Sequence, residues 1–267
     1  MFPDSITASL PYPVWLTAAG IAGLLWGSFA ASFAYRWPRA QSVWRGRSRC
    51  PACGRNLRAV MLIPLLSFLC LKGRCSYCHA AISYRYPLSE IVSAVSFVII
   101  AALAGPGADA LWLLALAALL LPLAMVDLEF QLLPDVLLLP AALLGLFHHL
   151  HLGFPQGSWQ MAALGLLIGA GTGLGLRFAI RYWKKQEGLG LGDVKFFGLA
   201  GWWCGALALG DFMLISGLAG LAFATLWRAS GKGRLFPFGP ALCIGLIATL
   251  LLSQHGYVPL ADYYRFD

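Results

Sequence analysis

Long apolar runs separated by short polar segments alternate along all 267 residues of the chain. Such runs predict membrane-spanning helices, because a helix needs about 20 mostly apolar residues to cross the hydrocarbon core of a bilayer. We therefore expect an all-α, polytopic helical membrane protein with about eight transmembrane helices. The runs lie at 13–35, 88–105, 110–126, 135–151, 160–180, 194–209, 212–227 and 236–253. Only Gly210 and Asp211 separate the sixth run from the seventh, so these two can form a tight hairpin.

The longest polar interruption covers residues 36–87 and divides the chain into three expected parts. These are a first transmembrane helix at 1–35, a loop domain at 36–87 and a membrane-embedded domain at 88–267. Composition supports this membrane class: 60% of the residues are hydrophobic and 11% are charged, whereas soluble domains carry about 25% charged residues.

Basic residues indicate how the chain is oriented in the membrane. Of the 19 Lys and Arg residues, ten lie in 36–87, five lie in or near the segment after the fifth run, and three follow the seventh. With eight crossings and the N-terminus outside, all 18 lie on the cytoplasmic side, where membrane proteins concentrate positive charge. The same distribution explains the net charge of +8 without a nucleic-acid partner.

The cytoplasmic loop contains two pairs of cysteines, each with the spacing Cys-x-x-Cys. The pairs are separated by 21 residues and consist of Cys50, Cys53, Cys75 and Cys78. Two thiolates on one tight turn can hold the same ion, and four thiolates suit a tetrahedral, structural zinc site. Disulfides remain an alternative, although a reducing cytoplasm disfavours them. His79, next to the fourth cysteine, is a possible substitute ligand.

Two acidic residues stand out because carboxylates are rare near membrane spans. Asp127 ends the third apolar run, where the negative end of the helix dipole disfavours a carboxylate. Asp193 follows the glycine-rich segment 188–192 and leads into the sixth run, so it is either a functional acid or an ordinary N-cap. Asp135, at the start of the fourth run, is expected to cap that helix.

The charge-derived topology places Asp127 and Asp193 at the same membrane face. Two carboxylates that approach within a few ångström share a proton, since both cannot ionise cheaply. One can then deprotonate a water molecule while the other protonates a substrate carbonyl oxygen, as in aspartic proteases. We predict this pair to be catalytic, with support for the substrate or the loop from Gly190, Gly192 and Lys195.

Two further patterns have simpler interpretations. Alternate glycines in the fifth run, Gly169, Gly171, Gly173 and Gly175, predict close helix packing rather than a dinucleotide-binding loop. A group of histidines at the end of the fourth run, His148, His149 and His151, is expected to lie at the outer membrane interface.

In order and spacing, several motifs of the chain resemble the bacterial type IV prepilin peptidases, also called prepilin leader peptidases/N-methyltransferases. They are Gly27-Ser-Phe29, the paired Cys-x-x-Cys loop, Arg85-Tyr-Pro-Leu-Ser-Glu90, Asp127 ahead of Leu133-Pro-Asp135, Gly190-Leu-Gly-Asp193-Val-Lys195, and Pro237-Phe-Gly-Pro240. The chain is also similar to the wider GxGD group of membrane aspartyl proteases.

The resemblance implies an endopeptidase of the cytoplasmic (inner) membrane. It would cleave the short basic leader of type IV prepilins or pseudopilins after a glycine at the cytoplasmic face, and methylate the new N-terminus with S-adenosylmethionine. The family's catalytic aspartates correspond to Asp127 and Asp193, and its zinc-type cysteines to those of the loop.

Two positions depart from the family pattern. Ala31 stands where the family usually has Asn in the first span, and Leu62 stands where it often has Asn before Ile-Pro. Both positions belong to the region that the family associates with methyl transfer, so they count against that second activity. The alternative to an enzyme is a non-catalytic, zinc-capped membrane scaffold or transporter.

Overall fold

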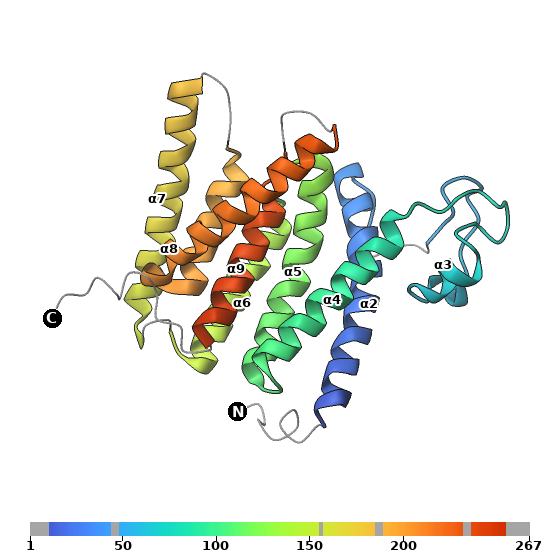
Figure 1. Ribbon diagram of the computed structural model, residues 1–267, viewed down its shortest axis with the longest axis horizontal. Coiled ribbons are helices and arrows are strands. Elements are labelled where there is room, and N and C mark those ends of the chain that lie inside the picture. Colours follow the sequence, from blue (N-terminus) through green and yellow to red (C-terminus); the bar gives the residue numbers. More distant parts are fainter. Residues whose placement is uncertain (1–10, 44–47, 155–156, 185–188, 232–235, 255–267) are drawn as a thin grey trace. The chain divides into compact units, whose positions relative to one another are not determined.

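The computed structural model describes residues 11–43, 48–154, 157–184, 189–231 and 236–254 (Figure 1). Its α-helices are Tyr12–Arg36 (α2), Leu66–Cys70 (α3), Arg85–Ala104 (α4), Ala108–Phe130 (α5), Asp135–Leu152 (α6), Trp159–Lys184 (α7), Leu191–Ala229 (α8) and Gly239–Gln254 (α9). Two short 3-10 helices are Trp37–Arg39 (η1) and Ala59–Leu62 (η2). Within these residues the only β-structure is two isolated bridges, both in the cysteine loop.

The helices confirm the expected all-α membrane protein. Among the described residues, six helices are long and apolar enough to cross a bilayer, and α9 is a shorter apolar helix of 16 residues. The number of eight crossings stays a prediction. So do the orientation and the division of the chain at residues 35 and 87. Several basic residues behind the orientation lie outside the described residues: Arg45, Arg47, Lys185, Lys232, Arg234 and Arg265.

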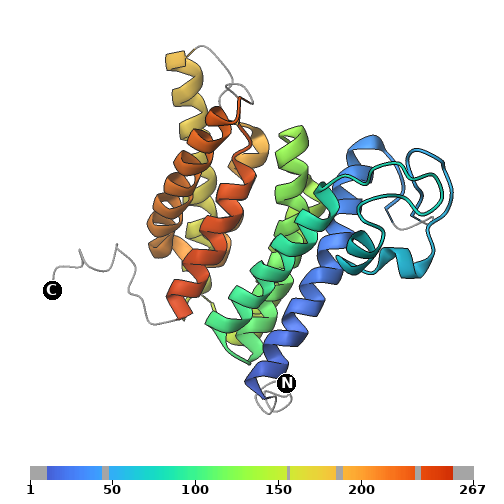
Figure 2. The same ribbon diagram turned by 45° about the vertical axis from the view of Figure 1, so that its right-hand side comes forward.

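The sixth and seventh apolar runs are joined in α8, which turns at a different place from the one expected. A straight helix of its 39 residues would be about 58 Å long, nearly twice the thickness of a hydrocarbon core. Gly205 breaks it with φ 76° and ψ 174°, a conformation that glycine adopts readily. Figures 1 and 2 show the two halves running back past each other, so α8 begins and ends on the same side. The turn therefore lies at Gly205 and not at Gly210 and Asp211.

The chain forms two compact units, residues 1–114 and 115–267. In the first unit, α2 packs closely on α4 because two glycines of α2 leave no room for side chains. A Cβ added to Gly23 would lie 2.7 Å from the Ala94 Cα, and one added to Gly27 would lie 2.7 Å from the Glu90 Cα. At the other end of the pair, the Trp15 indole N–H donates a 3.0 Å hydrogen bond to the Ala101 carbonyl.

In the second unit, α7 packs on the first half of α8 through a row of glycines. A Cβ on Gly165 or Gly169 would lie 2.2 Å from a backbone oxygen of α8, that of Gly201 or Phe197 respectively. The expected packing role is therefore correct for Gly169, and Gly173 also faces α8. It is wrong for the alternate positions Gly171 and Gly175, which face open space. Helical contacts recur every three or four residues, so alternate positions cannot all share one face.

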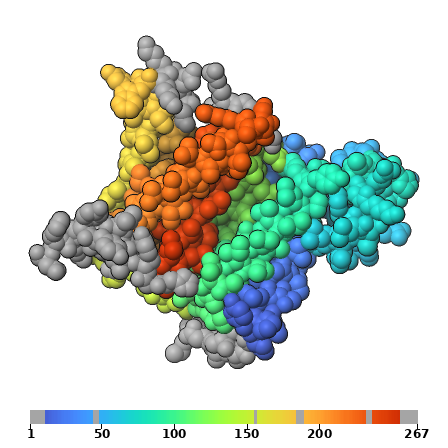
Figure 3. Space-filling view, viewed as in Figure 1, coloured from blue at the N-terminus to red at the C-terminus, as the bar shows by residue number. Residues whose placement is uncertain are grey.

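Many outward-facing residues of the spans are large and apolar, as expected for helices surrounded by lipid. Figure 3 shows α4 and the second half of α8 at the surface of their respective units. The exposed fractions on α8 reach 60% for Leu218 and 64% for Leu221, and Val95 of α4 is 50% exposed. Such exposure of large aliphatic side chains along whole helices fits a hydrocarbon environment.

Candidate active site

Asp127 is a buried carboxylate in the last turns of α5, with only 4% of the residue exposed. The Gly239 amide N–H, at the start of α9, donates a 2.6 Å hydrogen bond to its Oδ2 atom. The first N–H groups of a helix lack intrahelical acceptors and carry the positive end of the dipole. The N-terminus of α9 thus stabilises a carboxylate that the C-terminal end of α5 alone would disfavour.

In the sequence Gly239 stands out only as part of the Pro237-Phe-Gly-Pro240 motif, and the structure gives it a specific role. A Cβ at this position would lie 2.7 Å from Asp127 Oδ2 and 2.8 Å from its Cγ, which is too close for any real Cβ contact. Only glycine therefore lets the α9 backbone reach the carboxylate. The sequence shows a glycine between two prolines just before an apolar run, which indicates a special backbone position. It does not indicate that Asp127 is the residue this glycine contacts.

Asp193 lies in the first turn of α8 and is partly buried. The helix begins at Leu191 with Gly190 as N-cap, so Asp193 is the third helical residue and not the N-cap itself. Its Oδ2 atom nevertheless accepts a 3.0 Å hydrogen bond from the Gly190 N–H, the reciprocal half of a capping box. The carboxylate is thus held by the glycine-rich segment that precedes it.

Asp127 and Asp193 belong to the same compact unit and are held in the same way. Each carboxylate uses its Oδ2 atom to accept one backbone N–H, from Gly239 or Gly190. Among the described residues, no hydrogen-bond donor occupies either Oδ1 atom. Backbone N–H groups therefore orient both carboxyl groups. The Oδ1 atom of each can form a hydrogen bond with another molecule.

Asp135 and Lys195 form an ion pair. The Lys195 Nζ lies 2.7 Å from both carboxylate oxygens of Asp135, and the side chains are 54% and 69% exposed. The expected cap at Asp135 is wrong: Pro134 is the N-cap of α6, and no side chain caps this helix. Asp135 instead connects the start of α6 to the first turn of α8.

Gly192 packs against the segment between α5 and α6. A Cβ there would lie 2.8 Å from the Leu133 Cβ, so glycine allows the start of α8 to approach that segment. Together with the Asp135–Lys195 pair, this contact links the chain that follows Asp127 to the chain around Asp193.

His149 also differs from expectation. It is 2% exposed, and its Nε2 atom lies 2.9 Å from the Trp202 carbonyl oxygen of α8, so it is a buried packing residue and not an interfacial one. The aromatic rings of Trp202 and Phe154 pack against it. Hydropathy alone could not reveal this hydrogen bond, because Trp202 lies in a different helix.

The four loop cysteines converge as predicted. All four Sγ atoms lie within 4.8 Å of one another, and those of Cys50 and Cys78 are 3.8 Å apart. Tetrahedral zinc with Zn–S bonds of about 2.3 Å requires S–S distances near 3.8 Å, so this donor set fits structural zinc. His79 is not part of the cluster; it lies in the second turn, with φ 58°.

The two turns that carry the cysteines are equivalent. The Gly54 N–H bonds to the Cys50 carbonyl at 2.8 Å, and the His79 N–H bonds to the Cys75 carbonyl at 2.9 Å. The backbone amides of Tyr77 and Cys78 lower the pKa of the Cys75 thiol to about 7. This shift favours the Cys75 thiolate, whereas burial and the neighbouring thiols raise the pKa of Cys78 to about 11, so the four thiols do not ionise alike without a metal ion.

Two matches to known protein families together cover most of the chain. Residues 21–104 match the bacterial peptidase A24 N-terminal domain, and residues 113–225 match the type IV leader peptidase family. The chain belongs to the type IV leader peptidase family. The first match contains all four loop cysteines, and the second contains both Asp127 and Asp193.

Curated relatives of this leader peptidase align over most of their own length. The chain is 37% identical over 254 residues to the type 4 prepilin-like proteins leader peptide-processing enzyme of Escherichia coli O78:H11, covering 88% of the chain and 93% of the relative. It is 41% identical over 209 residues to a prepilin leader peptidase/N-methyltransferase of Aeromonas salmonicida, covering 76% of the chain and 71% of the relative. A third relative, the prepilin leader peptidase/N-methyltransferase of Neisseria gonorrhoeae, is 34% identical, covering 87% and 88%. No solved structure matches the chain.

Proposed function

We propose that this leader peptidase removes the leader peptide of type IV prepilins or pseudopilins, with Asp127 and Asp193 as its catalytic pair. Names of the curated relatives support the substrate class, since they refer to prepilin or prepilin-like proteins. The observation that carries the catalytic assignment is that two acids of one compact unit are each oriented by a backbone N–H through one oxygen only. A pair that shares one proton can act as both base and acid.

The chemistry follows from that protonation state. The ionised carboxylate takes a proton from water, and the water oxygen attacks the carbonyl carbon of the leader's last glycine. At the same time the protonated carboxyl group donates its proton to the carbonyl oxygen. When the tetrahedral intermediate collapses, the C–N bond breaks and the nitrogen receives a proton, leaving a free amine and a carboxylate. Neither step forms a covalent bond to the enzyme.

Three residues near Asp193 support this site by positioning the acids, and they take no part in the reaction itself. They are Gly190, Gly192 and Lys195. Gly190 donates its N–H to Asp193, and Gly192 allows close approach to Leu133. Lys195 pairs with Asp135 and so connects the start of α8 to the start of α6. These contacts connect the two segments that carry the acids, and a water-activating pair requires such positioning.

The zinc ion would be held by Cys50, Cys53, Cys75 and Cys78 and would supply folding energy to the cytoplasmic loop, with no part in hydrolysis. The loop has little core of its own: among its described residues, the buried hydrophobic ones are Cys50 and Cys75. Four cysteine ligands leave no open position on the metal, as in other structural sites.

A second activity, N-methylation of the new N-terminus with S-adenosylmethionine, is supported by the names of the relatives. Of the two positions that depart from the family pattern, Ala31 is buried in α2 and Leu62 is 40% exposed.

The orientation proposed for the inner membrane has the N-terminus outside and the active site at the cytoplasmic face. Basic residues in the segments that flank the acids support it. A non-catalytic scaffold or transporter is disfavoured, because transporters place acids near the bilayer midplane, whereas Asp127 and Asp193 lie at helix ends.

The test is leader removal by the full-length enzyme, purified in detergent, acting on a purified prepilin and followed by mass spectrometry. Asp127→Ala and Asp193→Ala should each lower the cleavage rate at least about 100-fold, the usual contribution of a general acid or base. Glu129→Gln, which removes an exposed acid from the same end of α5, is the matched control and should cleave normally. Normal cleavage by either aspartate variant would disprove the assignment.

A further inference from the structure

The segment between the two cysteine pairs, residues 59–71, presents large apolar side chains to the outside of the first unit. Four of them, between 43% and 73% exposed, form what we call the outer patch: Val60, Ile63, Leu66 and Leu69. Leu66 and Leu69 are three residues apart in α3 and therefore share one face of that helix. A group of exposed large apolar residues in a polar loop indicates an interaction surface.

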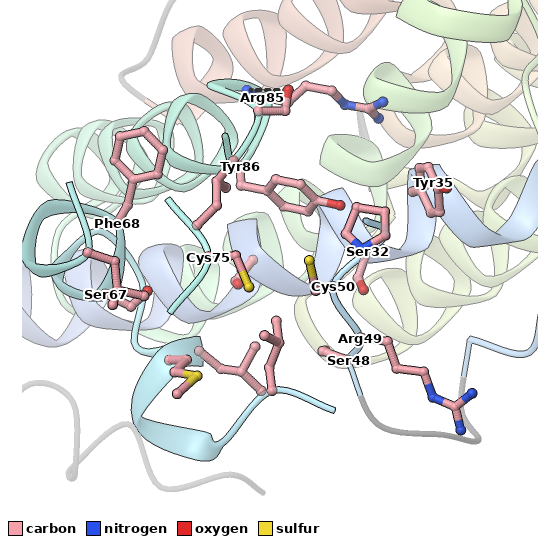
Figure 4. Close-up of a pocket in the computed structure, with 18 of the residues that line it drawn as sticks. Ser32, Tyr35, Ser48, Arg49, Cys50, Ser67, Phe68, Cys75, Arg85 and Tyr86 are labelled. Atoms are coloured by element: carbon pink, nitrogen blue, oxygen red, sulfur yellow. Dashed lines mark hydrogen bonds between the residues drawn. The ribbon is translucent and has the colours of Figure 1, made fainter. Parts of the chain in front are cut away.

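The opposite side of the same segment packs against the protein. Met61, Ser67, Phe68 and Leu71 line a cavity between α2, the start of α4 and the cysteine loop, and Figure 4 shows Ser67 and Phe68 there. The centroids of the Phe68 and Tyr84 rings are 5.6 Å apart. The described lining of this cavity includes no residue of the outer patch. Packing within the unit therefore explains the inner side of the segment and not its outer side.

A hydrogen bond fixes where this segment meets the membrane helices. The Leu65 N–H donates to Oε2 of Glu90 at 2.8 Å, and Leu65 turns the chain with φ 59°, which residues other than glycine adopt rarely. Glu90 is the sixth residue of α4, so it lies roughly 8 Å along the helix from Arg85. Basic residues at the end of a span lie at the level of the headgroups. The segment thus meets α4 at the depth of about 5–10 Å that is typical of helices lying in a membrane surface.

The position of α3 agrees with this depth. Figures 1 and 2 both show α3 level with the middle part of α2 and not beyond either end of that helix, within the same unit. On either side of Glu90, α4 carries Leu88 and Ile91, which are 61% and 45% exposed as expected for residues that face lipid. The outer patch therefore lies at the same level as the lipid-facing surface of α4.

The charge of the loop indicates which surface the outer patch meets. Residues 36–87 contain ten Lys and Arg residues and no Asp or Glu. Arg58, Lys72 and Arg74, at the two ends of the segment, are exposed. An apolar face flanked by basic residues is typical of segments that bind anionic membranes. The same charge disfavours pairing of this loop with the loop of a second copy.

We propose that the outer patch inserts into the headgroup–acyl boundary of the leaflet in which α4 begins, with anionic lipid headgroups at Arg58, Lys72 and Arg74. The cysteine loop is then a domain of the membrane surface and not a cap that stands in water. This contact goes beyond the proposed function, and the outer patch takes no part in hydrolysis.

Cys70 provides a probe for the test because it is exposed at the end of α3, next to the outer patch. The other cysteines belong to the metal cluster or are buried. A fluorophore is attached to Cys70 of the zinc-loaded, full-length enzyme in nanodiscs that contain phosphatidylglycerol. Lipids with a nitroxide near the headgroup should quench it at least about twofold, whereas iodide in the water should have little effect. Quenching by iodide and not by the lipids would overturn the proposal.

Two variants test whether the outer patch itself causes this protection. In the double variant Leu66→Gln and Leu69→Gln, lipid quenching should be lost and iodide quenching gained, with the zinc content unchanged. Asn56→Cys in a Cys70→Ser background moves the fluorophore to an exposed polar residue outside the outer patch, where iodide should quench it. Unchanged lipid quenching in the double variant, or equal lipid quenching at residues 56 and 70, would contradict insertion of the outer patch.

The lipid composition tests the role of the basic residues without changing the protein. Replacing phosphatidylglycerol by phosphatidylcholine should weaken lipid quenching of the Cys70 fluorophore, because the anionic headgroups are then absent. Equal quenching in both kinds of nanodisc would overturn the part of the proposal that concerns anionic lipid.

Other occupants of the outer patch give different results. If it binds the apolar part of a prepilin, iodide should reach the Cys70 fluorophore until prepilin is added. If it binds a second copy, protection should require two enzyme molecules in one nanodisc. Either result would overturn the proposal. The readout does not depend on leader removal, so an inactive enzyme with a lipid-protected Cys70 would contradict the proposed function and leave this inference intact.

Discussion

The Gly239 N–H donates a 2.6 Å hydrogen bond to Asp127 although 112 residues separate the two in sequence. This contact places the N-terminus of α9 against the C-terminal end of α5 and orients one of the two proposed catalytic acids. A Cβ at residue 239 has no space, so the contact depends on the glycine itself.

Gly239→Ala should therefore lower kcat for leader removal about 100-fold, because a displacement of about 1 Å in a catalytic group can cost that much. The measurement is cleavage kinetics with purified prepilin. Gly217→Ala is the control, since its site in α8 faces open space, and it should behave as wild type. Wild-type kcat in Gly239→Ala would show that the α9 contact does not position Asp127.

The ion pair between Asp135 and Lys195 should affect activity more than stability. Exposed pairs contribute only about 0.2–1 kcal/mol, and both side chains here are more than half exposed. If Lys195 acts through Asp135, then Asp135→Ala, Lys195→Ala and the double variant should lower kcat/KM by the same factor, within about threefold. A larger loss for Lys195→Ala than for Asp135→Ala would show that Lys195 acts on the substrate directly.

Close packing of α7 on α8 predicts different effects for two neighbouring glycines. Gly169→Ala would place a Cβ 2.2 Å from the Phe197 carbonyl oxygen and should lower the free energy of unfolding by about 1–3 kcal/mol, as overpacking does. Gly171→Ala, whose Cβ would face open space, should cause no loss. Thermal unfolding in detergent measures both variants. Equal stability of the two would contradict this packing.

The sequence predicted the helical spans and the cysteine cluster because both depend on local pattern. A run of apolar residues of the right length spans a membrane whatever its neighbours are, and two Cys-x-x-Cys turns need only to meet each other. The pairing of Asp127 with Gly239 and the burial of His149 against Trp202 depend on which helices are adjacent. The turn at Gly205 was also missed, because hydropathy located the break at the polar residue Asp211, which is 4% exposed and lies within the helix.

Zinc removal should unfold the cysteine loop selectively. Cys53→Ser is expected to lower the bound zinc, measured by mass spectrometry of the metal, from about one equivalent to a small fraction, because structural sites need all four ligands. The loop should then become sensitive to limited proteolysis, since metal binding supplies its folding energy. Cys70→Ser, an exposed cysteine outside the cluster, should retain both the zinc and the protease resistance. Full zinc content in Cys53→Ser would refute the four-cysteine site.

The most direct test of the central claim compares leader-removal rates of Asp127→Asn, Asp193→Asn and the double variant. Two groups that share one proton act as a unit, so removing both should cost little more than removing either. We predict a loss of about 10²–10⁴-fold in kcat for each single variant and no more than a few-fold further loss in the double variant. Losses that multiply in the double variant, or full activity in either single one, would contradict a shared catalytic pair.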